Sequence, residues 1–100
     1  MSNKANHTIN MGIQLVPLNN DANFELIDEA IAIIKKYNYK TTVTPFETVI
    51  ECTFEEGTNV LNELNLLCNK HDNLTWLLNV RIHAKTGSDI VMENKTEKHK

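Results

Sequence analysis

Glycine is scarce in this chain, and its three glycines, Gly12, Gly57 and Gly87, lie far apart. A phosphate-binding loop needs several glycines within a few residues, so that backbone N–H groups can surround a phosphate. The sequence has no such loop. This excludes the nucleotide sites that are built on one.

Basic and aromatic residues are also few, since the net charge is −3 and aromatic residues make up 6% of the chain. An RNA-binding sheet carries a basic surface and paired aromatic side chains on its central strands. The corresponding positions here hold Gln14, Val49 and Glu51, and a carboxylate there would repel phosphate. We therefore expect no nucleic-acid partner.

No apolar run reaches membrane-spanning length, and the opening segment Met1–Asn10 is polar with a single lysine. A secretory signal would need an apolar stretch there, so we expect a cytoplasmic protein with no membrane partner. Cys52 and Cys68 fall at apolar positions of a predicted strand and helix. We expect both to be small core residues in a reducing compartment.

The four histidines, His7, His71, His83 and His99, are scattered over both ends of the chain, a helix end and a strand end. None has a cysteine or carboxylate at the spacing of a metal site. We therefore expect no metal, no cofactor and no catalytic residue.

What the sequence does contain is regular hydrophobic patterning. Apolar residues recur at every second position from about Thr8 to Val16 and from Thr75 to His83, which predicts two strands. Trp76 is in phase with the apolar residues of the second strand, so we expect it to pack beneath the helices. Helical spacing of apolar residues predicts one helix between Phe24 and Tyr37 and another between Val60 and Cys68.

The segment Lys40–Phe54, between these helices, holds two β-rich runs that meet at Pro45. Proline cannot donate to a sheet ladder and belongs at a strand end, so the segment predicts a hairpin. The resulting order, β-α-β-β-α-β, predicts a single α+β domain over residues 1–100 with a ferredoxin-like fold. Its antiparallel four-stranded sheet would carry both helices on one face, with the first and third strands central.

The other sheet face would be uncovered and would mix apolar with polar side chains. It would carry Asn10, Gly12, Gln14, Val16, Val49, Glu51, Thr53, Leu77, Asn79, Arg81 and His83. Pairing two such faces would cover the apolar residues, so we expect at least a homodimer. Residues 1–6 should be loose, and residues 86–100 should form a tail or a short helix from Ile90 to Lys98 capped by Ser88 or Asp89.

Three segments together resemble the small thiamine-binding protein family related to YkoF: Gln14–Leu18, Thr44–Glu51 and Asn79–Ile82. The resemblance spans nearly the whole chain. It implies a dimer or tetramer that binds thiamine or its hydroxymethylpyrimidine part without transforming it, for carriage, sequestration or sensing. The chain departs from the family pattern at Glu47, which replaces a glycine of the hairpin, and at Asn19, Cys52 and His83.

An aminopyrimidine needs a few placed polar groups on an apolar wall. The residues expected to bind it are Gln14, Thr44, Phe46, Thr48, Glu51, Asn79 and Arg81. Phe46 would stack on the ligand, while Glu47 or Glu51 would attract a cationic thiazolium. Two alternatives stay open: Glu51, Gln14 and Arg81 could form a polar network at a subunit interface, and Phe46 could fold back onto its own core.

Two other functional classes are compatible with the sequence. The first is a ligand-free regulatory or protein-interaction module with the same fold. The second is an enzyme in which His83 titrates, which would require turnover that His83→Ala abolishes.

Overall fold

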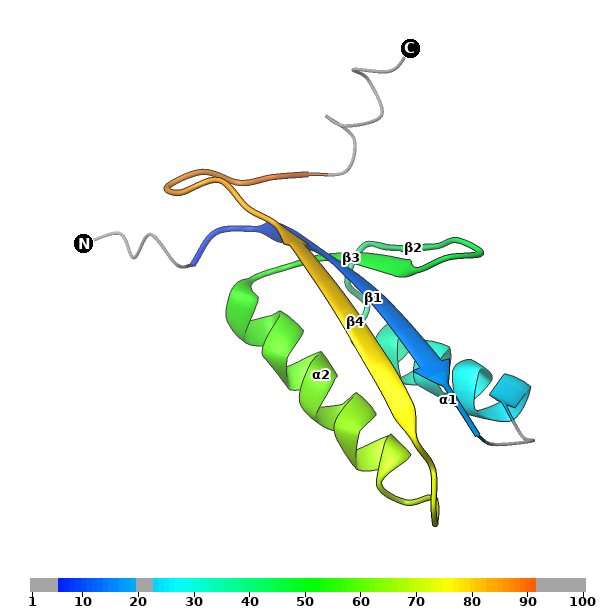
Figure 1. Cartoon of the computed structure of the whole chain (residues 1–100). Coiled ribbons are helices and arrows are strands. Elements are labelled where there is room, and N and C mark those ends of the chain that lie inside the picture. The colour runs from blue at the N-terminus through cyan, green and yellow to red at the C-terminus, as the bar shows by residue number, and fades with distance from the viewer. Residues whose placement is uncertain (1–5, 20–22, 92–100) are drawn as a thin grey trace.

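The computed structural model describes residues 6–19 and 23–91. Its elements follow the predicted order (Figure 1). They are β1 (Ile9–Pro17), α1 (Asn23–Lys36), β2 (Thr41–Val43), β3 (Thr48–Cys52), α2 (Phe54–Cys68) and β4 (Trp76–His83).

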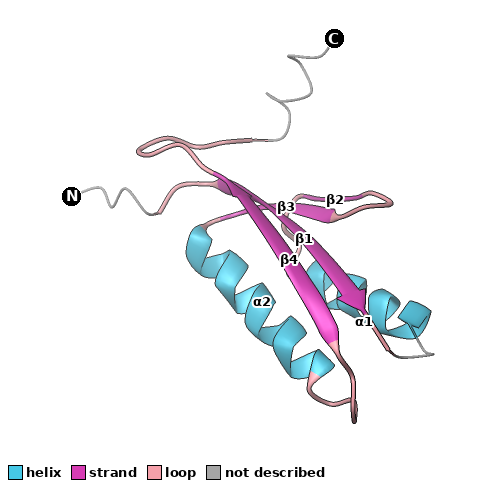
Figure 2. Cartoon of the chain, in the orientation of Figure 1, coloured by secondary structure: helices cyan, strands magenta, loops and turns pink. Residues whose placement is uncertain are grey.

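The four strands form one antiparallel sheet in the order β2-β3-β1-β4, as the sequence predicted. Figure 2 shows both helices on one face of this sheet, and the fold is therefore α+β and ferredoxin-like. The two ladders of β1 differ in length. Pairing between β1 and β3 stops at Ile13 opposite Thr48, while pairing between β1 and β4 continues to Pro17 opposite Trp76.

The core lies between the central strands and the two helices. Met11 and Ile50 face each other across β1 and β3, and both are fully buried with Val60 and Leu64 of α2. The lack of a side chain at Gly57 lets α2 lie close to the sheet. A Cβ atom added there would lie 2.4 Å from Cε of Met11. The apolar residues that alternate along the strands and those that recur at helical spacing thus form one core.

Helix α2 begins earlier than the hydrophobic pattern indicated. Thr53 is its N-cap: the Thr53 hydroxyl accepts from the Glu56 N–H, and the Glu56 carboxylate accepts from the Thr53 N–H. The prediction that Thr53 lies on the uncovered sheet face was therefore wrong, and so was the extension of the hairpin to Phe54. The capping-box spacing from Thr53 to Glu56 is the signal that marks this start.

The prediction that Trp76 packs beneath the helices stays a prediction, and its in-phase neighbours on β4 differ in burial. Leu78 packs against the core, whereas Trp76 is half-buried and Val80 and Ile82 are 37% and 42% exposed. The helices contact β1 and β3, and β4 lies at the edge of the sheet. The predicted topology gave β4 this edge position, but alternation alone does not show how far the helices extend over an edge strand.

The segment after β4 covers one end of the face that was expected to be open. The Ile90 N–H donates to the Thr8 carbonyl (2.9 Å), and the Thr8 N–H donates to Oδ1 of Asp89 (2.7 Å). Nδ2 of Asn10 donates to the Ile90 carbonyl (3.0 Å), and Asn10 is buried. Asp89 therefore caps the start of β1, and no helix begins at Ile90; residues 92–98 of the expected helix lie outside the described residues.

Both cysteines, Cys52 and Cys68, are buried and free, as expected of core thiols. Burial raises the pKa of the Cys52 thiol to about 11 and also raises the pKa of Cys68. Over the described ranges, neither helix has the length and apolar content that a bilayer crossing requires.

Candidate functional site

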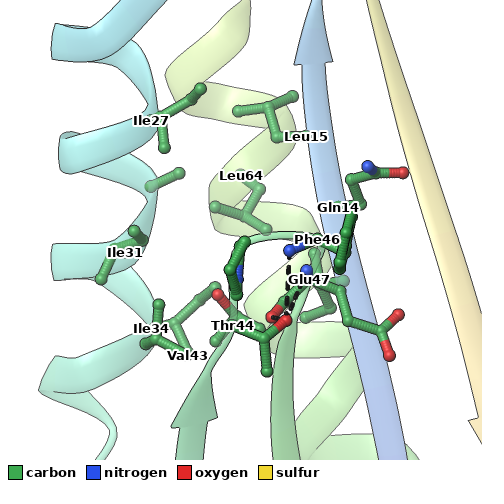
Figure 3. A pocket seen from close by; sticks show the side chains of 14 residues that line it. Gln14, Leu15, Ile27, Ile31, Ile34, Val43, Thr44, Phe46, Glu47 and Leu64 are labelled. Atoms are coloured by element: carbon green, nitrogen blue, oxygen red, sulfur yellow. Dashed lines mark hydrogen bonds between the residues drawn. The ribbon is translucent and has the colours of Figure 1, made fainter.

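A cavity of about 240 Å³ lies between α1, the β2–β3 loop and the end of β1, and we call it the hairpin pocket (Figure 3). Most of its wall is apolar: Ile13, Leu15, Ile27, Ala30, Ile31, Ile34, Val43, Pro45, Phe46 and Leu64. Its polar lining residues are Gln14, Thr44, Glu47 and Thr48. An apolar wall with a few polar groups is the usual composition of a small-molecule site.

The hairpin pocket follows from the register of the sheet. Beyond Ile13, β1 has no partner in β3, and the β2–β3 loop stands beside this unpaired end. The Thr44 hydroxyl fixes the loop, since it donates to the Glu47 carbonyl (2.7 Å) and accepts from the N–H groups of Phe46 (3.2 Å) and Glu47 (3.0 Å). The loop therefore holds its shape through local bonds.

Phe46 lies at the tip of this loop and is 78% exposed. The alternative that Phe46 folds back onto its own core is therefore wrong. Thr48, in contrast, is buried and faces the helices, opposite Ile13. The hairpin pocket thus has an exposed aromatic ring at its rim and a buried hydroxyl in its wall.

A second cavity, of about 260 Å³, lies on the sheet face opposite the helices, and we call it the sheet-face pocket. It is lined by Asn10, Gly12, Glu47, Val49, Arg81, Ile82 and His83. Oε2 of Glu47 accepts from Nη2 of Arg81 at 3.2 Å and forms an ion pair with it. Glu47 is therefore common to both pockets.

Glycine at position 12 makes this placement of Glu47 possible. A Cβ atom on Gly12 would lie 2.8 Å from Oε2 of Glu47, which is closer than real Cβ atoms approach an oxygen. The carboxylate therefore lies directly over the β1 backbone, beside Arg81. Sequence reasoning treated Glu47 as a departure from the family pattern and could not place it against Gly12, because that contact depends on the shape of the loop.

The structure divides the predicted ligand residues between three places. Gln14, Thr44, Phe46 and Thr48 line the hairpin pocket, whereas Arg81 lines the sheet-face pocket. The remaining two lie on strands outside both linings.

These two, Asn79 and Glu51, belong to the sheet. Nδ2 of Asn79 donates to Oε1 of Gln14 (3.1 Å), and Glu51 lies opposite Asn10 in the sheet register. The alternative of a network of Glu51, Gln14 and Arg81 at a subunit interface stays a prediction, and within the described chain Arg81 pairs with Glu47.

Clustered metal ligands and ionisable groups with shifted pKa values are the usual signs of catalytic chemistry. No group of three or more histidine, cysteine or acidic side chains in residues 6–19 and 23–91 could hold a metal ion. The pKa of Tyr37 is raised to about 12, mainly by its hydrogen bond to Glu63, but both residues lie outside the two pockets. His83 lines the sheet-face pocket at an exposed position.

Comparisons with known proteins agree with this architecture. A Thermotoga maritima structure described as a thiamine biosynthesis or salvage protein is 30% identical, with a TM-score of 0.79 over 93% of this chain and 99% of that one. A Streptococcus pneumoniae structure is also 30% identical, with a TM-score of 0.72 over 90% and 98% of the two chains. A domain of unknown function from Bacillus cereus, 18% identical, shares the fold with a TM-score of 0.83 over 99% and 96% of the two chains.

No curated protein matches the chain significantly. The model of one protein family, described as thiamine-binding protein, matches residues 11–100. That match includes β1 from Met11 onward, every later element through β4, and all of the residues that line the two pockets except Asn10. The chain belongs to the thiamine-binding protein family.

Proposed function

We propose that this protein binds thiamine, or its hydroxymethylpyrimidine moiety, in the hairpin pocket and releases it unchanged. The observation that carries the proposal is the hairpin pocket itself, which combines an apolar wall with Gln14, Thr44, Glu47 and Thr48. The family match supports the ligand class. Carriage, sequestration or sensing of the vitamin would each use such a site.

The pocket suits an aminopyrimidine in size and in chemistry. A volume of about 240 Å³ suits one heterocyclic ring better than a whole thiamine diphosphate. The ring would lie against Ile27 and Ile31 of α1, and the Thr48 hydroxyl would donate to a ring nitrogen. The thiazolium would then lie at the rim, near the ring of Phe46.

Isothermal titration calorimetry with thiamine, the pyrimidine fragment and thiamine diphosphate tests the proposal. Phe46→Ala should weaken thiamine binding by roughly 3- to 10-fold, the range expected for the loss of one aromatic contact. Leu66→Ala is the matched control, because Leu66 is also an exposed apolar side chain (63%) but lies on α2 outside both pockets.

Thr48→Val removes the buried hydroxyl while keeping the shape of the side chain, and it should weaken the pyrimidine fragment and thiamine alike. Binding of neither compound to folded wild-type protein would overturn the proposed function. Binding that neither Phe46→Ala nor Thr48→Val changes would place the ligand elsewhere.

We further propose that the protein works as a homo-oligomer in the cytoplasm. Val16 and Leu77 lie opposite each other on the sheet face away from the helices, and Leu77 is 49% exposed. A second copy is the simplest cover for these residues. The free thiols of Cys52 and Cys68 support a reducing compartment. Sedimentation equilibrium of wild-type protein and of Leu77→Asp measures the oligomeric state. A monomeric wild type would overturn the proposed homo-oligomer.

A ligand-free interaction module is the second candidate, and the exposed apolar side chains of β4, Leu77, Val80 and Ile82, favour it. A thermal-shift measurement separates the two candidates. Thiamine should raise the melting temperature of a thiamine-binding protein in a concentration-dependent way, and it should have no effect on an interaction module.

A further inference from the structure

The sheet-face pocket lies over a place in the sheet where a glycine leaves a gap. Gly12 pairs with Val49 on one side and with Arg81 on the other, so these three residues form one row across β3, β1 and β4. The Glu47 carboxylate lies over Gly12 and forms an ion pair with Arg81. A negative and a positive group therefore lie side by side, with Nη2 and Oε2 3.2 Å apart, in one pocket of about 260 Å³.

The Glu47 carboxylate has fewer hydrogen bonds than its burial calls for. Its side chain is 26% exposed, and within the described ranges the carboxylate accepts one hydrogen bond, from Arg81. An ionised carboxylate has about four acceptor positions, and a charge withdrawn from water is costly unless such positions are filled. Donors on a bound molecule would fill them.

Asn10 adds a second acceptor to the lining of the same pocket. It lies two residues from Gly12 on the same strand and is 2% exposed. Its Nδ2 donates to the Ile90 carbonyl, whereas its Oδ1 is buried and accepts no hydrogen bond from the residues that the structure describes. Buried polar atoms in native proteins are nearly always hydrogen-bonded. Two acceptors on neighbouring rows of the sheet therefore favour a ligand that carries N–H donors.

Arg81 gives the pocket the opposite chemistry. A guanidinium has five N–H donors, and the side chain of Arg81 is 85% exposed, so the donors that do not bind Glu47 are open to a ligand. A guanidinium binds carboxylates through two parallel hydrogen bonds. The pocket can therefore hold an anionic group at Arg81 as well as a cationic group at Glu47.

Adjacent opposite charges discriminate between ligands of different charge. A simple cation would meet Arg81 as a like charge, and a simple anion would meet Glu47. A molecule that carries an ammonium beside a carboxylate can place each group against its opposite. Val49 and Ile82 give the rest of such a molecule an apolar wall. The pocket is smaller than sites for drug-sized ligands, which span roughly 300–1,000 Å³, so it suits a small metabolite.

We propose that the sheet-face pocket is a second ligand site, which binds a small α-amino acid in its zwitterionic form. The ammonium lies between Glu47 and Asn10, and the carboxylate binds Arg81. Gly12 is the positioning residue, because a Cβ atom there would lie 2.8 Å from Oε2 of Glu47 and would displace the carboxylate. The inference does not rest on the proposed function.

A nuclear magnetic resonance titration of the ¹⁵N-labelled full chain tests the proposal with three probes of one carbon skeleton. They are L-valine, isobutylamine, which lacks the carboxylate, and isovalerate, which lacks the ammonium. L-Valine should shift the backbone amide signals of Gly12, Val49 and Arg81. It should also bind about tenfold more tightly than either analogue, the size expected of one charge-assisted hydrogen bond. Equal affinities for the three probes, or signals that none of them moves, would overturn the proposal.

Two variants should change the affinities in opposite directions, which a general loss of structure would not do. Glu47→Gln should weaken L-valine by about tenfold and tighten isovalerate, because the repulsion between two carboxylates is removed. Arg81→Gln should weaken L-valine and tighten isobutylamine for the corresponding reason. Binding of L-valine that neither variant alters would overturn the assignment of the site.

Lys70→Gln is the matched control, because Lys70 is an exposed cation in the turn after α2 and lies outside both pockets. It should leave all three affinities at their wild-type values.

Gly12→Ala tests the positioning role separately from charge. It keeps every charge and displaces the Glu47 carboxylate, so it should lower the ratio of L-valine to isovalerate affinity as Glu47→Gln does. The ratio of two affinities measured on one variant does not depend on the fraction of that variant that is folded. An unchanged ratio would overturn the role of Gly12.

Discussion

Replacing Gly57 by alanine tests the packing of α2 against the sheet. A Cβ atom at this position would lie 2.4 Å from Cε and 2.9 Å from Sδ of Met11, and 3.3 Å from Sγ of Cys52. Met11 is fully buried, so its thioether cannot move into solvent. Overpacking of this kind costs about 1–3 kcal/mol. Alanine gains roughly 0.5–1 kcal/mol over glycine inside a helix.

The net expectation for Gly57→Ala is a loss of about 1–2 kcal/mol in the free energy of unfolding. For a domain of this size, each 1 kcal/mol corresponds to a fall in Tm of roughly 4–8 °C. Equilibrium unfolding in urea, followed by circular dichroism, measures the loss directly.

Gly12→Ala is the matched control, because it makes the same chemical change in a strand. There the new Cβ atom would meet the far end of the Glu47 side chain, which is partly exposed and can move aside. Its stability should lie within about 0.5 kcal/mol of the wild type. A Gly57→Ala protein as stable as Gly12→Ala would refute this account of the core.

Three further predictions concern stability and titration. Thr53→Ala removes the N-cap of α2 and should cost about 1 kcal/mol in urea unfolding; an unchanged midpoint would count against the capping box. Tyr37 has its pKa raised from 10.0 to about 12, chiefly by its hydrogen bond to Glu63, so the stability from this bond is present below pH 10 and lost as the pH rises through about 12. Spectrophotometric titration should find a tyrosine ionising near pH 12 in the wild type and not in Tyr37→Phe. Cys52 and Cys68 should react with a thiol reagent at neutral pH only after unfolding, since burial raises the pKa of both thiols; rapid reaction of native protein would contradict their burial.

The fold could be predicted because its signals are local. Alternation in the segment of Ile9–Pro17 and helical spacing in the segment of Asn23–Lys36 each identify one element, and their order leaves few topologies. The early start of α2 could also have been predicted, since the Thr53 to Glu56 spacing is a recognised helix-start signal. The exposure of Val80 and Ile82 could not, because alternation does not show how far the helices extend over an edge strand.

The site could be predicted only in part, because its contacts join distant segments. Thr44 and Phe46 were assigned to the ligand site from the hairpin sequence, and the structure places both in the hairpin pocket. The contact of Glu47 with Gly12 depends on where the pairing of β1 and β3 ends, which the sequence does not encode locally. The burial of Asn10 depends on a polar segment after β4 that has no periodicity.

A crystal structure of the protein with bound thiamine tests the central claim most directly. We expect the pyrimidine ring in the hairpin pocket, between α1 and the β2–β3 loop, with the Thr48 hydroxyl at a ring nitrogen and the thiazolium beside Phe46. Thiamine bound on the sheet face near Glu51 and Asn79, with the hairpin pocket empty, would contradict the account.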